Sequence, residues 1–222
     1  MEVYHNSYHN RHLYLRINEA EADTLQNAAF DALMAERKKP LQILVPATAS
    51  RLVESLQRCG FVLKRSSFEM EVCKSELREA LPADTLQLLE AQRGTPEYEE
   101  CAALQYDYYA KTHAAVSPLT ASQTDFCKCL PDTVLFTSEN GYIRAGAFVE
   151  EQEIAYLFCR DRDAFRPFAD ALLFWLFRRF EHIEFEADDT DWAATGLKEL
   201  FSVPPTECYQ TFVRKIDGCS NG

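Results

Sequence analysis

The Asn140-Gly141 pair constrains the fold of this chain more than any other feature of its sequence. It joins two apolar segments, residues 133–138 and 142–149, and it suits the two positive φ angles of a type I′ turn. The sequence therefore predicts an antiparallel hairpin. Glu-Glu-Gln then turns the chain into a third predicted strand over residues 153–159.

A strongly amphipathic helix is predicted over residues 165–180, because its apolar residues recur at intervals of three and four. Pro167 falls in the first turn, where proline is tolerated. Three more elements follow: a strand over residues 182–187, a helix over 191–201 that Thr190 or Asp191 could cap, and a strand over 208–216. Upstream, helices are predicted over residues 96–115 and 122–130, so the order is α-α-β-β-β-α-β-α-β.

The first third of the chain corresponds to this run at a constant offset of 141 positions. The matches are Leu13, Leu15 and Ile17 with Ile154, Tyr156 and Phe158; residues 41–45 with 182–186; Leu56 with Leu197; and Phe68 and Val72 with Tyr209 and Val213. Chance similarity between two β-α-β-α-β runs is the alternative, but the even spacing favours a divergent duplication. We predict a truncated half domain over residues 1–73, a linker over 74–85, a complete domain over 86–217 and a tail over 218–222.

Charge and hydropathy restrict the partners. A net charge of -12 and a pI near 4.9 repel phosphate backbones and anionic lipid. The N-terminus has no cationic segment followed by an apolar core, and no apolar stretch is long enough to span a bilayer. We therefore predict a cytoplasmic protein that binds neither nucleic acid nor membrane.

The eight cysteines are scattered among apolar neighbours and are predicted to be reduced. Cys127 and Cys129 form a close pair without the spacing or second ligand pair of a zinc site. His5, His9 and His12 lie in a segment that Asn and Ser residues break into a turn. No metal site is expected.

The element order over residues 96–216, together with Cys59-Gly60-Phe61 after the helix of the first copy, resembles the GNAT acetyltransferase superfamily. The resemblance implies an α+β protein with the GNAT-like acyl-CoA N-acyltransferase fold. Such a fold has a mixed central sheet with helices on both faces, here with a partial N-terminal repeat, so that the chain is a tandem repeat.

The resemblance also implies acetyl-CoA as co-substrate, bound where two parallel strands splay apart, with its pyrophosphate on N–H groups at the start of the next helix. The family signature Q/R-x-x-G-x-G/A corresponds to residues 160–165. The implied coenzyme-binding residues are Arg160, Arg162, Asp163, Ala164 and Phe165, with Tyr156 and Phe158 on the preceding strand. Asp163 and Phe165 replace glycine or a small residue, and Arg160, Arg162 and Arg166 could compensate as cations. In the first copy, residues 18–23 carry three acids and no glycine, which predicts no CoA binding there.

Candidate catalytic residues lie on the predicted strand over residues 182–187. Period-two alternation places Glu184, Glu186 and Asp188 on one face. Glu184 and Glu186 could act as general base toward an amine and Asp188 could bind it; the alternative is a solvent-exposed face, or one paired with Arg178 or Arg179. The family's usual general acid is a Tyr on the following helix, but residues 190–201 contain none.

The predicted helix over residues 96–115 carries Tyr106, Tyr109 and His113 on one stripe. The resemblance implies that Tyr109 and His113 line the acceptor pocket, although an aromatic stripe is also typical of core packing.

We therefore predict a GNAT-type N-acetyltransferase that transfers an acetyl group from acetyl-CoA to an amine of a small molecule or peptide, with a homodimer as an open possibility. The alternative is a non-catalytic GNAT-fold module for ligand binding or protein interaction that has lost CoA binding. Missing glycines and the missing Tyr favour the alternative, and the resemblance favours the enzyme.

Overall fold

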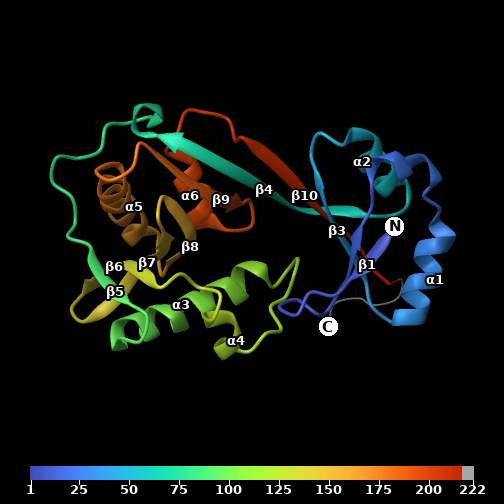
Figure 1. Ribbon diagram of the computed structural model, residues 1–222, viewed down its shortest axis with the longest axis horizontal. Coiled ribbons are helices and arrows are strands. Elements are labelled where there is room, and N and C mark those ends of the chain that lie inside the picture. Colours follow the sequence, from blue (N-terminus) through green and yellow to red (C-terminus); the bar gives the residue numbers. More distant parts are fainter. Residues whose placement is uncertain (217–222) are drawn as a thin grey trace. The chain divides into compact units, whose positions relative to one another are not determined.

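A computed structural model describes residues 1–216, so the predicted tail over 218–222 lies outside the described residues (Figure 1). Contacts along the chain divide it into two units. The N-terminal unit contains residues 1–67, 113–121 and 207–216. The C-terminal unit contains residues 68–112 and 122–206.

The C-terminal unit is built on a mixed sheet in the order β9-β8-β7-β6-β5. Its strands are β5 (Leu89–Gln92), β6 (Thr133–Glu139), β7 (Tyr142–Glu150), β8 (Glu153–Cys159) and β9 (His182–Asp188). Neighbours from β5 to β8 are antiparallel, whereas β8 and β9 are parallel. Asn140 and Gly141 have φ angles of 53° and 81°, which confirms the predicted hairpin turn.

Four helices cover the two faces of this sheet (Figure 1). They are α3 (Pro96–His113), α4 (Gln123–Cys127), α5 (Arg162–Phe177) and α6 (Trp192–Glu199). On one face, Leu135, Ala145 and Ala147 pack with the buried side of α5 and with Leu197 of α6. On the other face, Tyr98 of α3 meets Phe148 of β7 edge-on at 5.4 Å between ring centroids. The predicted element order is thus confirmed, although α5 begins three residues before the predicted helix.

Asp161 explains that earlier start, because its side chain accepts a hydrogen bond from the N–H of Ala164 and so caps α5. Asp191 caps α6 in the same way, by accepting from the N–H groups of Ala193 and Ala194. Of the two predicted caps for that helix, the structure selects Asp191.

The N-terminal unit has its own hydrophobic core. Its elements are β1 (Glu2–Tyr4), β2 (Leu13–Arg16), η1 (Glu19–Thr24), α1 (Asn27–Arg37), β3 (Leu41–Pro46), α2 (Ser50–Arg58) and β10 (Glu207–Arg214), with the first part of β4 (Val62–Cys73). β2 and β3 are parallel, and β10 pairs antiparallel with β3 from Tyr209↔Pro46 to Arg214↔Leu41. Leu15, Ile43, Phe30 and Leu56 form its core together with Phe212 of β10.

Elements that share the 141-position offset are of the same type: β2 and β8, β3 and β9, α2 and α6, β4 and β10. Duplication of one ancestral segment would account for this correspondence. Residues 68–73 of β4 belong to the C-terminal unit and β10 to the N-terminal unit.

The segment after β4 is packed against the C-terminal unit. It begins with η2 (Lys74–Glu76), and Leu77 and Leu81 contact the core of that unit. The N–H of Arg78 donates to the carbonyl of Leu200 at 2.9 Å, so this part of the predicted linker is ordered by main-chain bonds. No helix within residues 1–216 has the length and apolar character needed to cross a membrane.

Candidate active site in the splayed strands

The parallel strands β8 and β9 separate soon after they meet. Their pairing consists of Glu153↔Glu184 and Ile154↔Phe185. One residue later β8 is irregular, because Val149 pairs with Ile154 and Phe148 with Tyr156, which leaves Ala155 as a bulge. A bulge bends a strand and increases its twist. The carboxyl ends of β8 and β9 therefore diverge, and ligands of open α/β sheets bind at such strand ends.

The helix that follows β8 offers an N-terminus to this opening, but the chain itself supplies an anion there. The Oδ1 atom of Asp161 accepts from the N–H of Ala164 at 2.9 Å, and Arg144 Nη2 donates to Asp161 Oδ2 at 2.7 Å. These N–H donors and the Arg144 guanidinium hold the pKa of Asp161 below its usual range. An external phosphate would compete with this carboxylate for the same end of the helix.

Phe165 reaches from the start of α5 to α6. A Cβ atom on Gly196 would lie 2.8 Å from the ring of Phe165, so the ring rests directly on the glycine. The same ring meets Trp192 edge-on at 5.8 Å, and the guanidinium of Arg162 lies 5.1 Å from the centre of Trp192. Ala164 is half-buried, while Arg160 and Asp163 are exposed beside this contact.

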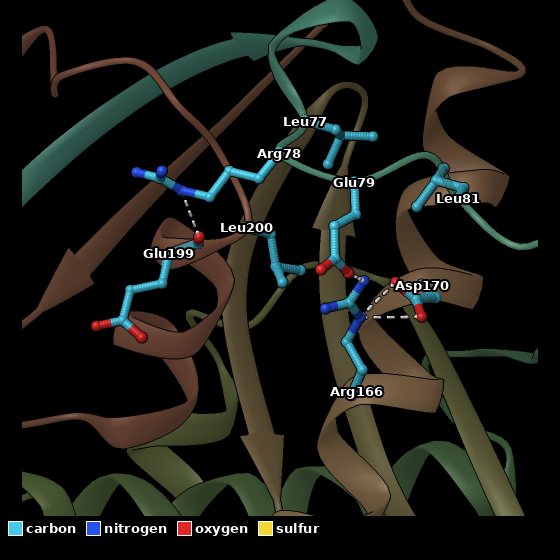
Figure 2. A pocket seen from close by; sticks show the side chains of 8 residues that line it. All are labelled: Leu77, Arg78, Glu79, Leu81, Arg166, Asp170, Glu199 and Leu200. Carbon is cyan, nitrogen blue, oxygen red and sulfur yellow. Dashed lines mark hydrogen bonds and ion pairs between the residues drawn. The ribbon is translucent and has the colours of Figure 1, made fainter.

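Arg166, the third compensating cation proposed from the sequence, already has two anionic partners (Figure 2). Its Nε atom donates to both carboxylate oxygens of Asp170, at 2.9 and 3.1 Å, and its Nη2 atom donates to Glu79 at 2.8 Å. These side chains line a small pocket between the segment after β4, α5 and the end of α6. The positive charge of Arg166 is therefore balanced by the carboxylates of Asp170 and Glu79 within the pocket.

The acidic face of β9 lies as the alternation predicts. Ile183, Phe185 and Ala187 are buried in the core with α5 and α6, whereas Glu184 and Glu186 are exposed and Asp188 is buried. Gln152 Nε2 donates to Glu184 Oε1 at 3.2 Å. Arg178 and Arg179, the alternative partners considered for this face, lie over the rings of Phe174 and Trp175.

Glu153 is a carboxylate that the sequence analysis missed. It pairs with Glu184 across the strands, at the last point before they separate. Its burial, followed by the charges of Glu150 and Glu184, raises the pKa of Glu153. A cluster of like charges in three neighbouring strand segments is visible only after the sheet order is known.

Tyr109, which was predicted to line the acceptor pocket, meets Tyr156, which was predicted to bind coenzyme, on the α3 side of the sheet. Tyr109, Phe126 and Tyr156 contact one another, with ring centroids 5.0 to 6.3 Å apart. Phe158 is buried and its ring lies over Gly146, where a Cβ atom would be 2.6 Å away. His113 is placed elsewhere: it is grouped with the N-terminal unit, and its ring stacks on His9 at 6.1 Å.

The sequence did not predict a role for Tyr108, because this residue lies off the helical stripe that Tyr106 and Tyr109 share. Its hydroxyl donates to Asp191 Oδ1 at 2.5 Å. Burial, and then the charge of Asp191, raise the pKa of Tyr108. The four consecutive aromatic or acidic residues at 106–109 give no periodic signal that distinguishes Tyr108.

Comparison with known proteins supports the fold. No protein-family model matches the sequence, and no curated protein matches it. Among solved structures, a GCN5-related N-acetyltransferase from Sphaerobacter thermophilus aligns with 96% of this chain and 75% of its own, at a TM-score of 0.56 and 13% identity. A GCN5-related N-acetyltransferase from Kribbella flavida aligns with 91% of this chain and 78% of its own, at a TM-score of 0.51 and 15% identity.

A functionally unknown conserved protein from Staphylococcus epidermidis aligns over 91% of this chain and 82% of its own, at a TM-score of 0.52 and 10% identity. The chain has the fold of the GCN5-related N-acetyltransferases. At these identities the likeness establishes the fold alone.

Proposed function

We propose that this protein is an acyl-CoA-dependent N-acyltransferase of the GNAT type, which transfers an acetyl group to an amine of a small molecule or peptide. The single observation that carries the proposal is the separation of β8 from β9 directly after Ile154 and Phe185, with a bulge at Ala155. Beyond this point β8 stays paired with β7, but its side toward β9 opens at the carboxyl end of a parallel pair, and the next helix begins there.

The main-chain framework fits an acyl-CoA, while the loop fits it only if internal contacts give way. The N-terminus of α5 and exposed Arg160 and Arg162 suit a diphosphate. The Asp161 carboxylate and the Phe165 ring occupy parts of the same region. We therefore expect weak coenzyme binding that depends on displacing Asp161.

In the proposed reaction an uncharged amine attacks the thioester carbonyl carbon, the new C–N bond forms, and the C–S bond breaks so that coenzyme A leaves as its thiolate. Glu184 or Glu186 would accept the proton that the amine loses, and Asp188 would help to hold the amine. A main-chain N–H of β8 beyond the bulge would stabilise the negative charge on the carbonyl oxygen. Holding both reactants in place would supply much of the acceleration.

Calorimetric titration of the purified protein with acetyl-CoA tests the proposal. We expect binding that is lost in the double variant Arg160→Glu/Arg162→Glu. The matched control is Arg178→Glu/Arg179→Glu, which makes the same charge change at the other end of α5 and should keep the affinity. Absence of heat and of thermal stabilisation at millimolar acetyl-CoA would rule the function out, because a bound ligand must stabilise the fold.

A non-catalytic GNAT-fold module is the second candidate, and two contacts favour it. Asp161 already satisfies N–H groups at the start of α5, and Phe165 already rests on Gly196. The variant Asp161→Asn separates the two candidates, since its side chain can still cap the helix without a charge. An N-acyltransferase should then bind acetyl-CoA about tenfold more tightly, whereas a module that has lost the site should remain silent in the titration.

A further inference from the structure

Tyr108 departs from the other tyrosines of α3 in the side of the sheet that it contacts. Tyr106 and Tyr109 pack on Phe126, on the same side of the sheet as α3. Tyr108 instead packs against the core cluster that contains Leu172, Leu197 and the other buried residues of α5 and α6. Helices α3 and α5 lie on opposite faces of the sheet (Figure 1).

A side chain can pass from one face of a sheet to the other only where neighbouring strands are not hydrogen-bonded. The described pairing of β8 with β9 ends at Ile154 and Phe185, so the carboxyl ends of these strands leave such a passage. The partners of Tyr108 lie on the two sides of this passage. Cys159, the last residue of β8, is close enough to raise the pKa of Tyr108, and Asp191 follows the end of β9.

The bond that holds Tyr108 in the passage is strong. The hydroxyl lies 2.5 Å from Asp191 Oδ1, and that same oxygen accepts the N–H groups of Ala193 and Ala194 at the start of α6. A charged acceptor fixed at a helix N-terminus cannot easily turn away. Cys159 beside it is 2% exposed, and burial raises the pKa of its thiol to about 11.

We propose that Tyr108 and Asp191 form a gate in the passage between the ends of β8 and β9. In the closed state described here, the phenol fills the passage; a thioester can enter from the α5 side only after the phenol has left. The identity of the ligand rests on the proposed function, whereas the filling of the passage by Tyr108 does not. Tyr108 thus determines access to the site and touches no reacting atom.

The first experiment tests the filling of the passage without coenzyme. Each cysteine is alkylated with iodoacetamide at pH 8, and the rates are followed by mass spectrometry. Tyr108→Ala should raise the rate of Cys159 at least tenfold relative to that of Cys101, which is fully buried on α3. Tyr106→Phe is the matched control on the same helix and should leave the ratio unchanged. A ratio that stays constant in Tyr108→Ala would overturn the gate, and because the ratio is internal, general loosening of the fold cannot imitate the expected result.

The second experiment measures acetyl-CoA binding in Tyr108→Phe, which keeps the ring and removes the bond to Asp191. We expect an affinity at least tenfold higher than in the wild type, because the closed state loses a bond to a charged acceptor. Equal or lower affinity in Tyr108→Phe would contradict control of access by Tyr108. If neither protein binds acetyl-CoA while Cys159 becomes reactive in Tyr108→Ala, the proposed function fails and acyl-CoA is excluded as the ligand of the gate, but Tyr108 is established as filling the passage.

Discussion

The two units place a similar loop after a parallel strand, but they use it differently. In the N-terminal unit, β2 leads to the short η1, where Asn18 accepts from the N–H of Ala20 and Glu21 accepts from that of Asn18. In the C-terminal unit, β8 leads to the 16-residue helix α5, capped by Asp161. Both loops satisfy their own N–H groups, but the second runs directly into a 16-residue helix and itself contains the exposed arginines Arg160 and Arg162.

This difference teaches that a shared element order can carry two differently capped loops. Two of the three acids of the first loop have cationic partners: Asp23 pairs with Arg51, and Glu21 with the chain N-terminus at 2.5 Å. In the second loop the carboxylate of Asp161 accepts the N–H of Ala164 at the start of α5, while Asp163 is exposed. Asp161 is therefore the acid of this loop that occupies the end of the long helix.

The largest expected effect is a loss of stability at low pH in the N-terminal unit. Burial, followed by the charges of His9 and Lys215, lowers the pKa of His12 in the N-terminal unit to about 4, whereas an unfolded histidine titrates near 6.5. Between these values the unfolded chain binds more protons than the folded chain. The stabilising contribution of neutral His12 therefore decreases as the pH falls below about 6.5, and it is gone below about 4. Because the imidazole is only half-buried and solvent screens its charge, we expect this proton uptake to cost about 2 kcal/mol of the free energy of unfolding.

Hydrogen exchange followed by mass spectrometry at pH 7 and pH 5 checks this expectation. Peptides of the N-terminal unit should lose protection on acidification beyond the change in intrinsic rate. His12→Leu should reduce that loss, while His182→Asn, at an exposed position of the C-terminal unit, should leave it unchanged. If the wild type and His12→Leu lose the same protection on acidification, His12 is not the cause of that loss.

A second expectation concerns the contact between Phe165 and Gly196 in the C-terminal unit. Alanine at Gly196 should favour helix α6 by about 0.5 to 1 kcal/mol, but its Cβ atom would meet the Phe165 ring at 2.8 Å. Gly196→Ala should therefore be roughly 1 kcal/mol more favourable in a Phe165→Ala background than in the wild type. Urea unfolding of the four proteins measures this coupling, and additive effects would show that the ring does not rest on α6.

The smallest expected effect concerns the cap of the loop that follows β2 in the N-terminal unit. Asn18→Ala removes the side chain that caps η1 and should cost about 0.5 to 1 kcal/mol of unfolding free energy. Asn10→Ala, at another exposed asparagine of the same unit, is the control and should have little effect. Thermal unfolding measures both, and equal midpoints would mean that this loop needs no cap.

Much of the fold follows from short-range signals in the sequence. The Asn140-Gly141 turn, the alternation from Ile183 to Ala187 and the helical spacing before Leu176 depend on neighbours a few positions away, and all three are confirmed. For the same reason the sequence identified Asp191 as one of two caps. The sequence also showed that Asp163 and Phe165 stand where the family signature has glycine or a small residue.

Long-range pairing was beyond the sequence, because it depends on which segments meet after the chain has folded. Nothing in residues 207–214 indicates that β10 pairs with β3, and the small number of pairs between β8 and β9 appears only in their register. The Asp161–Arg144 and Tyr108–Asp191 bonds join residues 17 and 83 positions apart. The sequence determined the elements, their order and the altered loop; the tertiary structure alone decided which side chains occupy the passage that this loop borders, since each comes from a different element.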